Sequence, residues 1–235
     1  MSAFLTLSDA ETQALWLSLG VALRSVAFSL PIAIGAAWLL SRTRFPGKTL
    51  IDGLVHLPLV LPPVVVGYLL LLGFGVRGPA GHWLYETFGL RLAFTTAGAS
   101  LATAVMAFPL MVRAIRLGLD AVDRGLEDAA RTLGAGAFDR FASITLPLML
   151  PGILAGAVVA FAASLGEFGA VITFASNIPG ETQTLPLAIY QAIQTPGGDA
   201  MATRLALLSI AIALSGLVVS EIMARRVRAM TAGDA

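Results

Sequence analysis

The stretch LMLPGILAGAVVAFAASLGEFGAVITFA, residues 148–175, carries a single charged side chain, Glu167. A helix needs roughly 20 mainly apolar residues to cross a hydrocarbon core about 30 Å thick. The stretch is therefore predicted to span a membrane. The rest of the chain agrees, because 57% of its 235 residues are hydrophobic and only 12% are charged, whereas soluble domains are about a quarter charged. This composition excludes a soluble globular protein.

Four further stretches are long and apolar enough to cross, so we expect an all-α bundle of five transmembrane helices. The expected spans are residues 15–40, 54–76, 92–112, 148–175 and 205–223. If residues 185–195 form a short re-entrant helix, six spans would be counted. The expected organisation is one transmembrane domain over residues 12–224, with tails at 1–11 and 225–235.

The positions of Lys and Arg predict the orientation of these spans. Eleven of these cations lie after the first, third and fifth spans, and three lie in the other connections. Short cytoplasmic segments are the ones enriched in Lys and Arg. The N-terminus and the tail 1–11 are therefore expected outside, and the tail 225–235 inside. The long connection over residues 113–147 becomes a cytoplasmic loop.

Several kinds of chemistry are missing from the sequence. The chain has no cysteine, and its two histidines, His56 and His82, stand apart. It has no Gly-rich loop ending in Gly-Lys-Ser/Thr, which would cradle nucleotide phosphates. A net charge of +1 argues against a nucleic-acid partner. We therefore expect no catalytic, metal or cofactor site, and any uphill transport would draw its energy from another polypeptide.

The inside loop carries the most informative pattern. From residue 120 to 147 it reads DAVDRGLEDAARTLGAGAFDRFASITLP. Apolar residues recur there at steps of three and four, from Val122 through Leu126 and Leu133 to Ala137, which is the period of one helix face. The pattern predicts a short amphipathic helix of about three turns, with Asp120 or Asp123 as the N-cap. Gly134 and Gly136 are the residues expected to end it.

An isolated helix of this kind must cover its apolar face with something else. It can lie on the membrane surface or enter a groove on a soluble partner. The acids on its polar side favour the partner over an anionic membrane surface.

In the fourth span, Gly152, Gly156 and Ala160 stand four residues apart, a spacing that favours close helix packing. A moving gate helix is the alternative interpretation of that spacing.

The same loop resembles the EAA loop of ABC-importer permeases. That motif is Glu-Ala-Ala, three residues, Gly, nine residues, and Ile-x-Leu-Pro, and every spacing is matched here. One departure is Asp128 at the usual Glu position, with Glu127 one place earlier, so which acid makes the expected polar contact stays open. The matching residues are Asp128, Ala129, Ala130, Gly134, Ile144, Leu146 and Pro147.

A wider resemblance points to the molybdate ABC transporter permeases. It is carried by HLPLVLPPVVVGYLLLL (56–72), AVMAFPLMVRAIRLGLDAVD (104–123), ITLPLMLPGILAG (144–156) and the segment SLGEFGAVITFASNIPGETQTLP (164–186). It implies the type I importer permease fold in the inner membrane of a bacterium, surrounded by lipid. It also implies a homodimer that works with two separate ATPase subunits and a periplasmic molybdate-binding protein.

The resemblance implies that the loop helix couples ATP hydrolysis to transport, through the motif residues with Glu127 and Arg131 at its rim. Glu167 and Arg24, the charges inside spans, are candidates for the pathway or gate; a structural hydrogen bond is the alternative for Glu167. Sulfate and tungstate permeases share the plan. An ATP-independent secondary carrier and a membrane scaffold are the remaining alternative functions.

Overall fold

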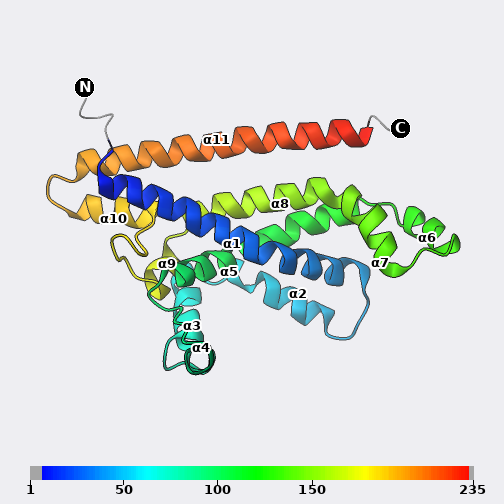
Figure 1. Ribbon diagram of the computed structural model, residues 1–235, viewed down its shortest axis with the longest axis horizontal. Coiled ribbons are helices and arrows are strands. Elements are labelled where there is room, and N and C mark those ends of the chain that lie inside the picture. Colours follow the sequence, from blue (N-terminus) through cyan, green and yellow to red (C-terminus); the bar gives the residue numbers. More distant parts are fainter. Residues whose placement is uncertain (1–6, 233–235) are drawn as a thin grey trace.

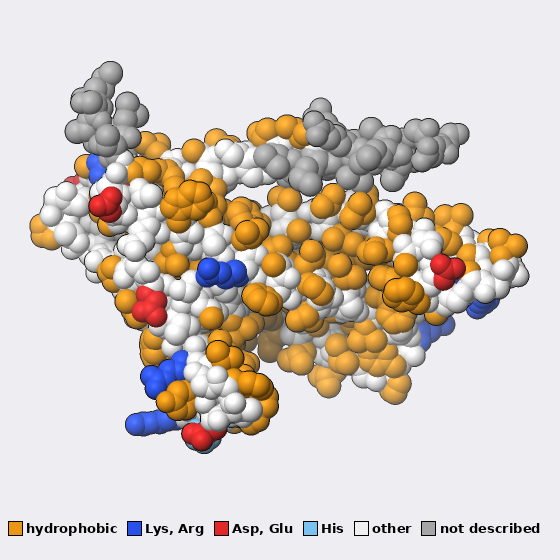
Figure 2. Space-filling model, in the orientation of Figure 1, with side chains coloured by type: hydrophobic (Ala, Val, Ile, Leu, Met, Phe, Trp, Pro, Cys, Tyr) orange, Lys and Arg blue, Asp and Glu red, His pale blue; other side chains and the backbone are white. Residues whose placement is uncertain are grey.

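A computed structural model describes residues 7–232, with side chains beyond Gly216 placed only at Val218 and Ile222. The described part is helical and contains no strand, as expected for an all-α membrane bundle (Figure 1). Four helical segments are long and apolar enough to cross a membrane. A bent pair, Lys48–Leu59 with Pro63–Phe74, makes a fifth if it is counted as one span. Figure 2 shows hydrophobic side chains over most of the visible face between the two ends of the bundle.

The helices have the following bounds. The first half contains α1 (Asp9–Arg42), α2 (Lys48–His56), η2 (Leu57–Leu59), α3 (Pro63–Phe74), α4 (Pro79–Phe88) and α5 (Thr96–Asp120). The second half contains α6 (Arg124–Thr132), α7 (Ala137–Arg140), η3 (Phe141–Thr145), α8 (Leu146–Gly166), α9 (Gly169–Phe174), α10 (Leu185–Gln194) and α11 (Asp199–Ala232).

Helix α1 begins with a reciprocal cap and is tied at once to α11. The Ser8 hydroxyl accepts the N–H of Glu11, and the Glu11 carboxylate accepts the N–H of Ser8. Such a capping box satisfies two backbone donors that a helix start otherwise leaves free. Glu11 also accepts a hydrogen bond from Arg204 at 2.8 Å, with its own side chain fully buried. One carboxylate therefore starts α1 and joins it to the last helix.

The centre of the bundle is formed by α1, α5 and α8, and small residues let these helices approach closely. A Cβ on Gly152 of α8 would lie 2.7 Å from the Cα of Gly118 on α5. Gly156 faces the Met111 carbonyl in the same way, and Ala160 is fully buried. The four-residue spacing in the fourth span therefore marks a packing face, because only residues without a large side chain permit this contact.

The second and fourth expected spans are interrupted. The α2 and α3 axes differ by 112°. The break falls at Pro62–Pro63, where Pro62 is extended (ψ 135°), because a residue before proline is disfavoured in the helical region. Helix α8 ends at Gly166, and α9 begins three residues later. These two interrupted regions pack together, since Gly67 of α3 faces the backbone of Ala170 and Gly169 faces Pro63.

The structure also describes the expected re-entrant helix and part of the expected tails. Residues 185–195 do contain a short helix, α10, and it is too short to be counted as a span. Residues 1–6 and 233–235 of the expected tails lie outside the described residues, as do the side chains of the C-terminal cations after the fifth span.

The Gly118–Gly152 contact generates a stability prediction. Replacing Gly152 with Ala places a methyl group against the α5 backbone, and overpacking of this kind costs about 1–3 kcal/mol. The thermal unfolding midpoint of the purified protein in detergent should fall by several degrees. Gly20→Ala on α1 is the matched control, because a Cβ there meets nothing within 4 Å. The control should hold or raise the midpoint, since Ala favours a helix over Gly by about 1 kcal/mol. Equal midpoints for the two variants would contradict the close approach.

Candidate coupling site

Helix α6 projects from one end of the bundle and is held by a cap at each end (Figure 1). At its start the Asp123 carboxylate accepts the N–H of Gly125 at 2.8 Å. At its end Gly134 adopts a left-handed conformation with φ +89°. The Gly134 N–H donates to the Arg131 carbonyl and the Ala135 N–H donates to the Ala130 carbonyl. This is the Schellman arrangement, which favours glycine at the left-handed position. Asp123 is therefore the N-cap and Gly134 the residue that ends the helix.

The helix is shorter than the apolar period suggests. Val122 lies before it and is buried in the bundle core, with 5% of its surface exposed. No residue of α6 itself is buried. The exposed apolar residues from α6 to the start of α7 are Leu126, Ala129, Leu133, Ala137 and Phe138, and Leu133 and Phe138 are more than 80% exposed. No part of the described chain buries these side chains.

The two neighbouring acids of α6 face different surroundings. Glu127 points toward the bundle, where its Oε1 lies 3.2 Å from a terminal nitrogen of Arg42 and accepts the Thr145 hydroxyl at 2.8 Å. Asp128 points outward and pairs with Arg131 at 3.4 Å, with about two thirds of each side chain exposed. The two acids therefore offer different contacts: Glu127 is used within the chain, and Asp128 is open to a partner.

Arg42, the last residue of α1, completes this junction. The same terminal nitrogen donates to the backbone carbonyls of Leu119 and Val122 at 3.1 and 3.3 Å. Leu119 lies in the last turn of α5 and Val122 two residues past it, and the Leu119 carbonyl also accepts the Val122 N–H. Arg42 therefore binds the carbonyl end of α5, where a helix lacks donors of its own. In the sequence, Arg42 is one of the cations in the connection that follows the first expected span. Its place two residues after the first expected span was the one available signal, and that signal does not identify its partners.

The second half of the motif belongs to the helix that re-enters the bundle. Arg140 donates to the Ala135 carbonyl at 2.7 Å and fixes the link between α6 and α7. Residues 141–145 form a π turn, in which the Leu146 N–H donates to the Phe141 carbonyl. Ile144 and Leu146 are half-buried, and Pro147 is exposed. These residues shape the start of α8, whereas the exposed surface belongs to α6.

Glu167 and Arg24 lie away from α6. The Glu167 carboxylate accepts the N–H of Ala170 at 2.8 Å and so caps α9 across the break after α8. Arg24 lies about 22 Å along α1 from Asp9, at 1.5 Å per residue. It is exposed and makes no hydrogen bond or ion pair with another described residue.

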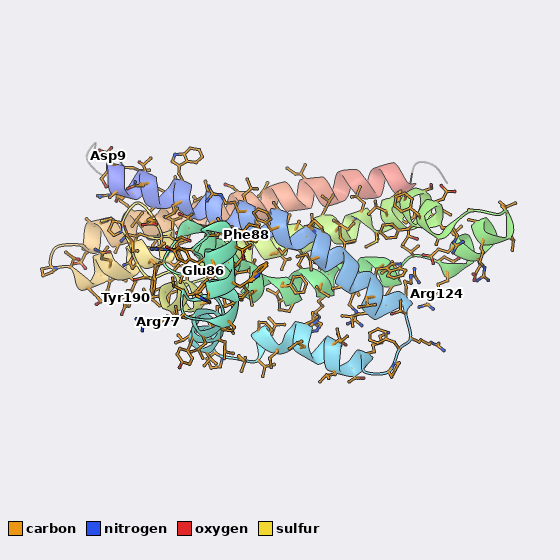
Figure 3. The ribbon with its side chains drawn as sticks, turned by 60° about the horizontal axis from the view of Figure 1, so that its bottom comes forward. Asp9, Arg77, Glu86, Phe88, Arg124 and Tyr190 are labelled. Carbon is orange, nitrogen blue, oxygen red and sulfur yellow. The ribbon has the colours of Figure 1, made fainter. Side chains whose placement is uncertain are left out.

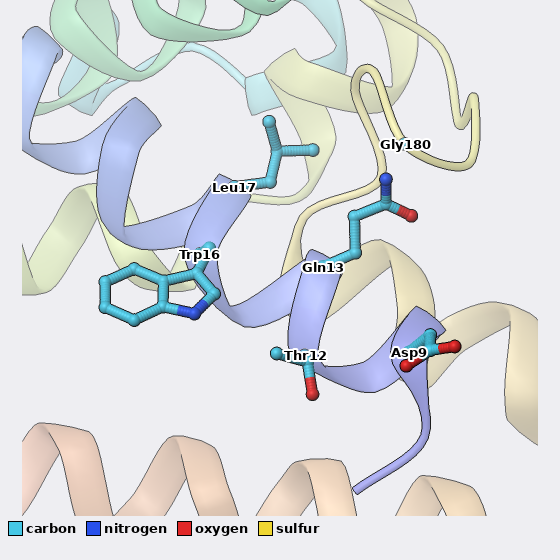
Figure 4. A pocket seen from close by; sticks show the side chains of 6 residues that line it. All are labelled: Asp9, Thr12, Gln13, Trp16, Leu17 and Gly180. Atoms are coloured by element: carbon cyan, nitrogen blue, oxygen red, sulfur yellow. The ribbon is translucent and has the colours of Figure 1, made fainter.

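The other end of the bundle is formed by the start of α1 and the loop before α10. Asp9 of α1 and Arg124 of α6 mark the two ends in Figure 3. At the Asp9 end, Gly180 of the loop and the first turns of α1 line an open pocket (Figure 4). The pocket residues are Asp9, Thr12, Gln13, Trp16, Leu17 and Gly180. Nearby, Gln191 accepts hydrogen bonds from Asn177 and Gln183 and orders the loop.

Within residues 7–232, no three His, Cys, Asp or Glu side chains are placed to hold a metal ion.

Solved structures show which class of fold this is. A bacterial ABC transporter that imports the acidic polysaccharide alginate aligns with a TM-score of 0.75 and 18% identity, covering 94% of this chain and 80% of that one. The MetNI methionine ABC transporter aligns with a TM-score of 0.72 and 18% identity, covering 94% and 99%. The chain therefore has the fold of an ABC importer permease of type I.

Sequence comparison gives the family. The model described as "Binding-protein-dependent transport system inner membrane component" matches residues 29–229. The molybdenum transport system permease protein ModB of Escherichia coli K12 is 62% identical over 93% of this chain and 96% of its own length. ModB of Haemophilus influenzae is 57% identical, covering 93% and 95%. The sulfate transport permease CysT of E. coli K12 is 37% identical, covering 81% and 70%. The chain belongs to the binding-protein-dependent transport system inner membrane components, and its relatives are permeases, not enzymes.

The different surroundings of the loop residues can be measured by cysteine labelling, because the chain has no cysteine of its own. Asp128→Cys and Leu133→Cys should react with a water-soluble maleimide at least tenfold faster than Val122→Cys, since a thiol must be reached by solvent to react. The measurement is the labelling rate of the folded protein in detergent, with labelling after denaturation as the control for total thiol. Equal rates at residues 122 and 133 would contradict the arrangement described.

Proposed function

We propose that this chain is the permease subunit of an ATP-driven molybdate importer and works as a homodimer. Two separate ATPase subunits would bind it on one side of the membrane, and a periplasmic molybdate-binding protein on the other. The observation that carries the proposal is the capped helix α6, which projects from one end of the bundle with an exposed apolar face. The relatives support the cargo, because molybdenum permeases reach 62% identity and a sulfate permease 37%.

The charge distribution supports an orientation with α6 in the cytoplasm. Arg42 and Arg116 lie at or near the ends of α1 and α5 that face α6, and Arg131 lies on α6 itself. Cytoplasmic segments favour such cations. The start of α1 and the loop around Gly180 would then face the periplasm, with the N-terminus outside and the C-terminus inside. This places the docking helix on the side where ATP is found.

Helix α6 would dock in a groove of the ATPase. Leu126, Ala129 and Leu133 supply apolar anchors at helical spacing, which is how an amphipathic helix fills a groove. Ala130 and Arg131 join these anchors in the docking surface. Asp128 would make the polar contact with the ATPase, because Glu127 is already engaged with Arg42 and Thr145. Ile144, Leu146 and Pro147 would set the direction in which the docked loop pushes on α8.

The pathway would lie between two copies of the chain. The α5–α8 contact is too close at Gly118 and Gly152 to leave a passage between these two helices. A second copy would supply the other wall of the pathway. We place Arg24 and Glu167 on this pathway or its gate. Arg24 supplies an exposed cation inside a span, where a charge is costly and usually functional. Glu167 caps α9 at the break after α8, so its hydrogen bond would respond to movement at that break.

Reconstitution tests the function directly. Vesicles holding the permease, the ATPase and the molybdate-loaded binding protein should accumulate molybdate only when ATP is present. Vesicles with the permease alone should not accumulate it, because the chain contains no phosphate-binding loop. Uptake by the permease alone would favour a secondary carrier, and no uptake with all components would favour a scaffold. Competition with tungstate and sulfate identifies the preferred anion.

A pair of glycines in the same loop tests the docking helix. Gly134→Val should abolish co-purification with the ATPase and molybdate uptake, because a β-branched residue at φ +89° is strongly disfavoured and would remove the cap of α6. Membrane insertion should remain, since the spans are unchanged. Gly136→Val is the matched control, because Gly136 has φ −64° and open space around it. Normal ATPase binding by Gly134→Val would remove α6 from the docking assignment.

A further inference from the structure

The junction beneath α6 connects parts of the chain that are far apart in sequence. Arg42 ends α1, the carbonyls of Leu119 and Val122 mark the end of α5, and Glu127 lies on α6. Thr145 closes the π turn that leads into α8, and its hydroxyl donates to the same Glu127 oxygen that faces Arg42. The three central helices of the bundle and the docking helix therefore meet at one guanidinium and one carboxylate.

Burial gives this junction more weight than a surface ion pair. The Arg42 side chain is 8% exposed and that of Glu127 is 25% exposed, while Thr145 is 3% exposed. Exposed pairs contribute little because solvent screens them. A charge that loses its partner in a nearly buried position is much more costly. If Glu127 moved away while Arg42 stayed in place, Arg42 would be a nearly buried charge without its partner, which costs free energy.

Glu127 is also the side chain that connects α6 to the bundle. Among the described residues, the other polar side-chain contacts of α6 stay within the helix and its N-cap: Asp128 with Arg131, Thr132 with the Ala129 carbonyl, and Asp123 with Gly125. Since α6 buries none of its residues, a force applied to its outer face reaches the bundle through Glu127, through the contacts of α6 with α7 and η3, and through the chain at either end.

The junction is not saturated with hydrogen bonds. The Nε of Arg42 is buried and has no acceptor among the described residues, while one terminal nitrogen faces three oxygens. Buried donors are nearly always paired. A guanidinium with five donors in a rigid fork can exchange these acceptors when its neighbours shift, so the cluster can be rearranged without being dismantled.

We propose that Arg42 is a positioning residue for energy coupling. The Arg42–Glu127–Thr145 junction passes displacement of the docking helix to the ends of α1, α5 and α8. This inference rests on the proposed function, since it assumes that an ATPase moves α6. It assigns a role to a residue outside the motif. It also gives the two acids different roles: Asp128 contacts the ATPase, and Glu127 transmits the displacement of α6 within the permease.

The test uses the complete complex in vesicles with the ATPase and molybdate-loaded binding protein. Arg42→Ala should still co-purify with the ATPase and hydrolyse ATP, because the outer face of α6 is unchanged. Molybdate transported per ATP should fall about tenfold, within the usual range for coupling between sites. Arg42→Lys should recover only part of the ratio, since an ammonium lacks the planar fork. Arg44→Ala, which removes the same charge from an exposed position two residues away, should keep the wild-type ratio.

A double-mutant cycle separates transmission from general stability. Arg42→Ala combined with Glu127→Gln should lower the ratio no further than either change alone, because both remove one contact. Additive losses, or uptake and hydrolysis that fall in proportion, would show Arg42 to be only a cap for α5 and would overturn the inference. An unchanged ratio in Arg42→Ala would overturn it as well. A wild-type chain that fails to bind the ATPase or to transport with ATP would instead refute the proposed function.

Discussion

The fold depends on one constraint: backbone polar groups in an apolar layer must find hydrogen bonds within the protein. The long helices α1, α5 and α8 meet it internally, except for the one hydrogen bond that each loses at an interior proline: Pro31, Pro109 and Pro151. The interruptions meet it with specific residues. Pro62 and Pro63 have no backbone N–H to satisfy, and the Pro62 carbonyl accepts the N–H groups that start α3. After Gly166 the carboxylate of Glu167 accepts an N–H of α9. The two interrupted regions then pack against each other through Gly67 and Gly169. Breaks in the spans are thus placed where the rest of the chain can support them.

The same reasoning explains how so short a helix as α6 can be present at the end of the bundle. Nine residues are too few for a stable isolated helix, and α6 buries none of them. Its order comes from the Asp123 cap and the left-handed Gly134, and the contact of Glu127 with Arg42 ties it to the bundle. A helix that is already formed loses less conformational freedom when a partner binds. The loop therefore presents an apolar surface that is already ordered, so little conformational entropy is lost when a partner binds.

Much of this arrangement was predictable, and the failures have identifiable causes. The spans followed from length and apolarity, and α6 followed from its period and capping residues. Val122 fits that period but lies in the core, because the chain turns at Asp123 before the helix begins. Residues 148–175 carry one charge, Glu167, and were expected to be continuous. The helix stops at Gly166, since mean hydropathy does not register a break that packing against α3 supports. Arg42 was counted only for its charge, because its partners are 77 to 85 positions further along the chain.

The residue pattern was enough to establish a membrane bundle, its family and a helix whose outer face needs a partner, because these depend on local period and composition. The different directions of Glu127 and Asp128 required the folded chain. Adjacent residues on a helix point about 100° apart, and which of them meets the bundle depends on where α1, α5 and α8 place their ends. That placement arises from contacts such as Gly118 with Gly152, between residues that no local pattern connects.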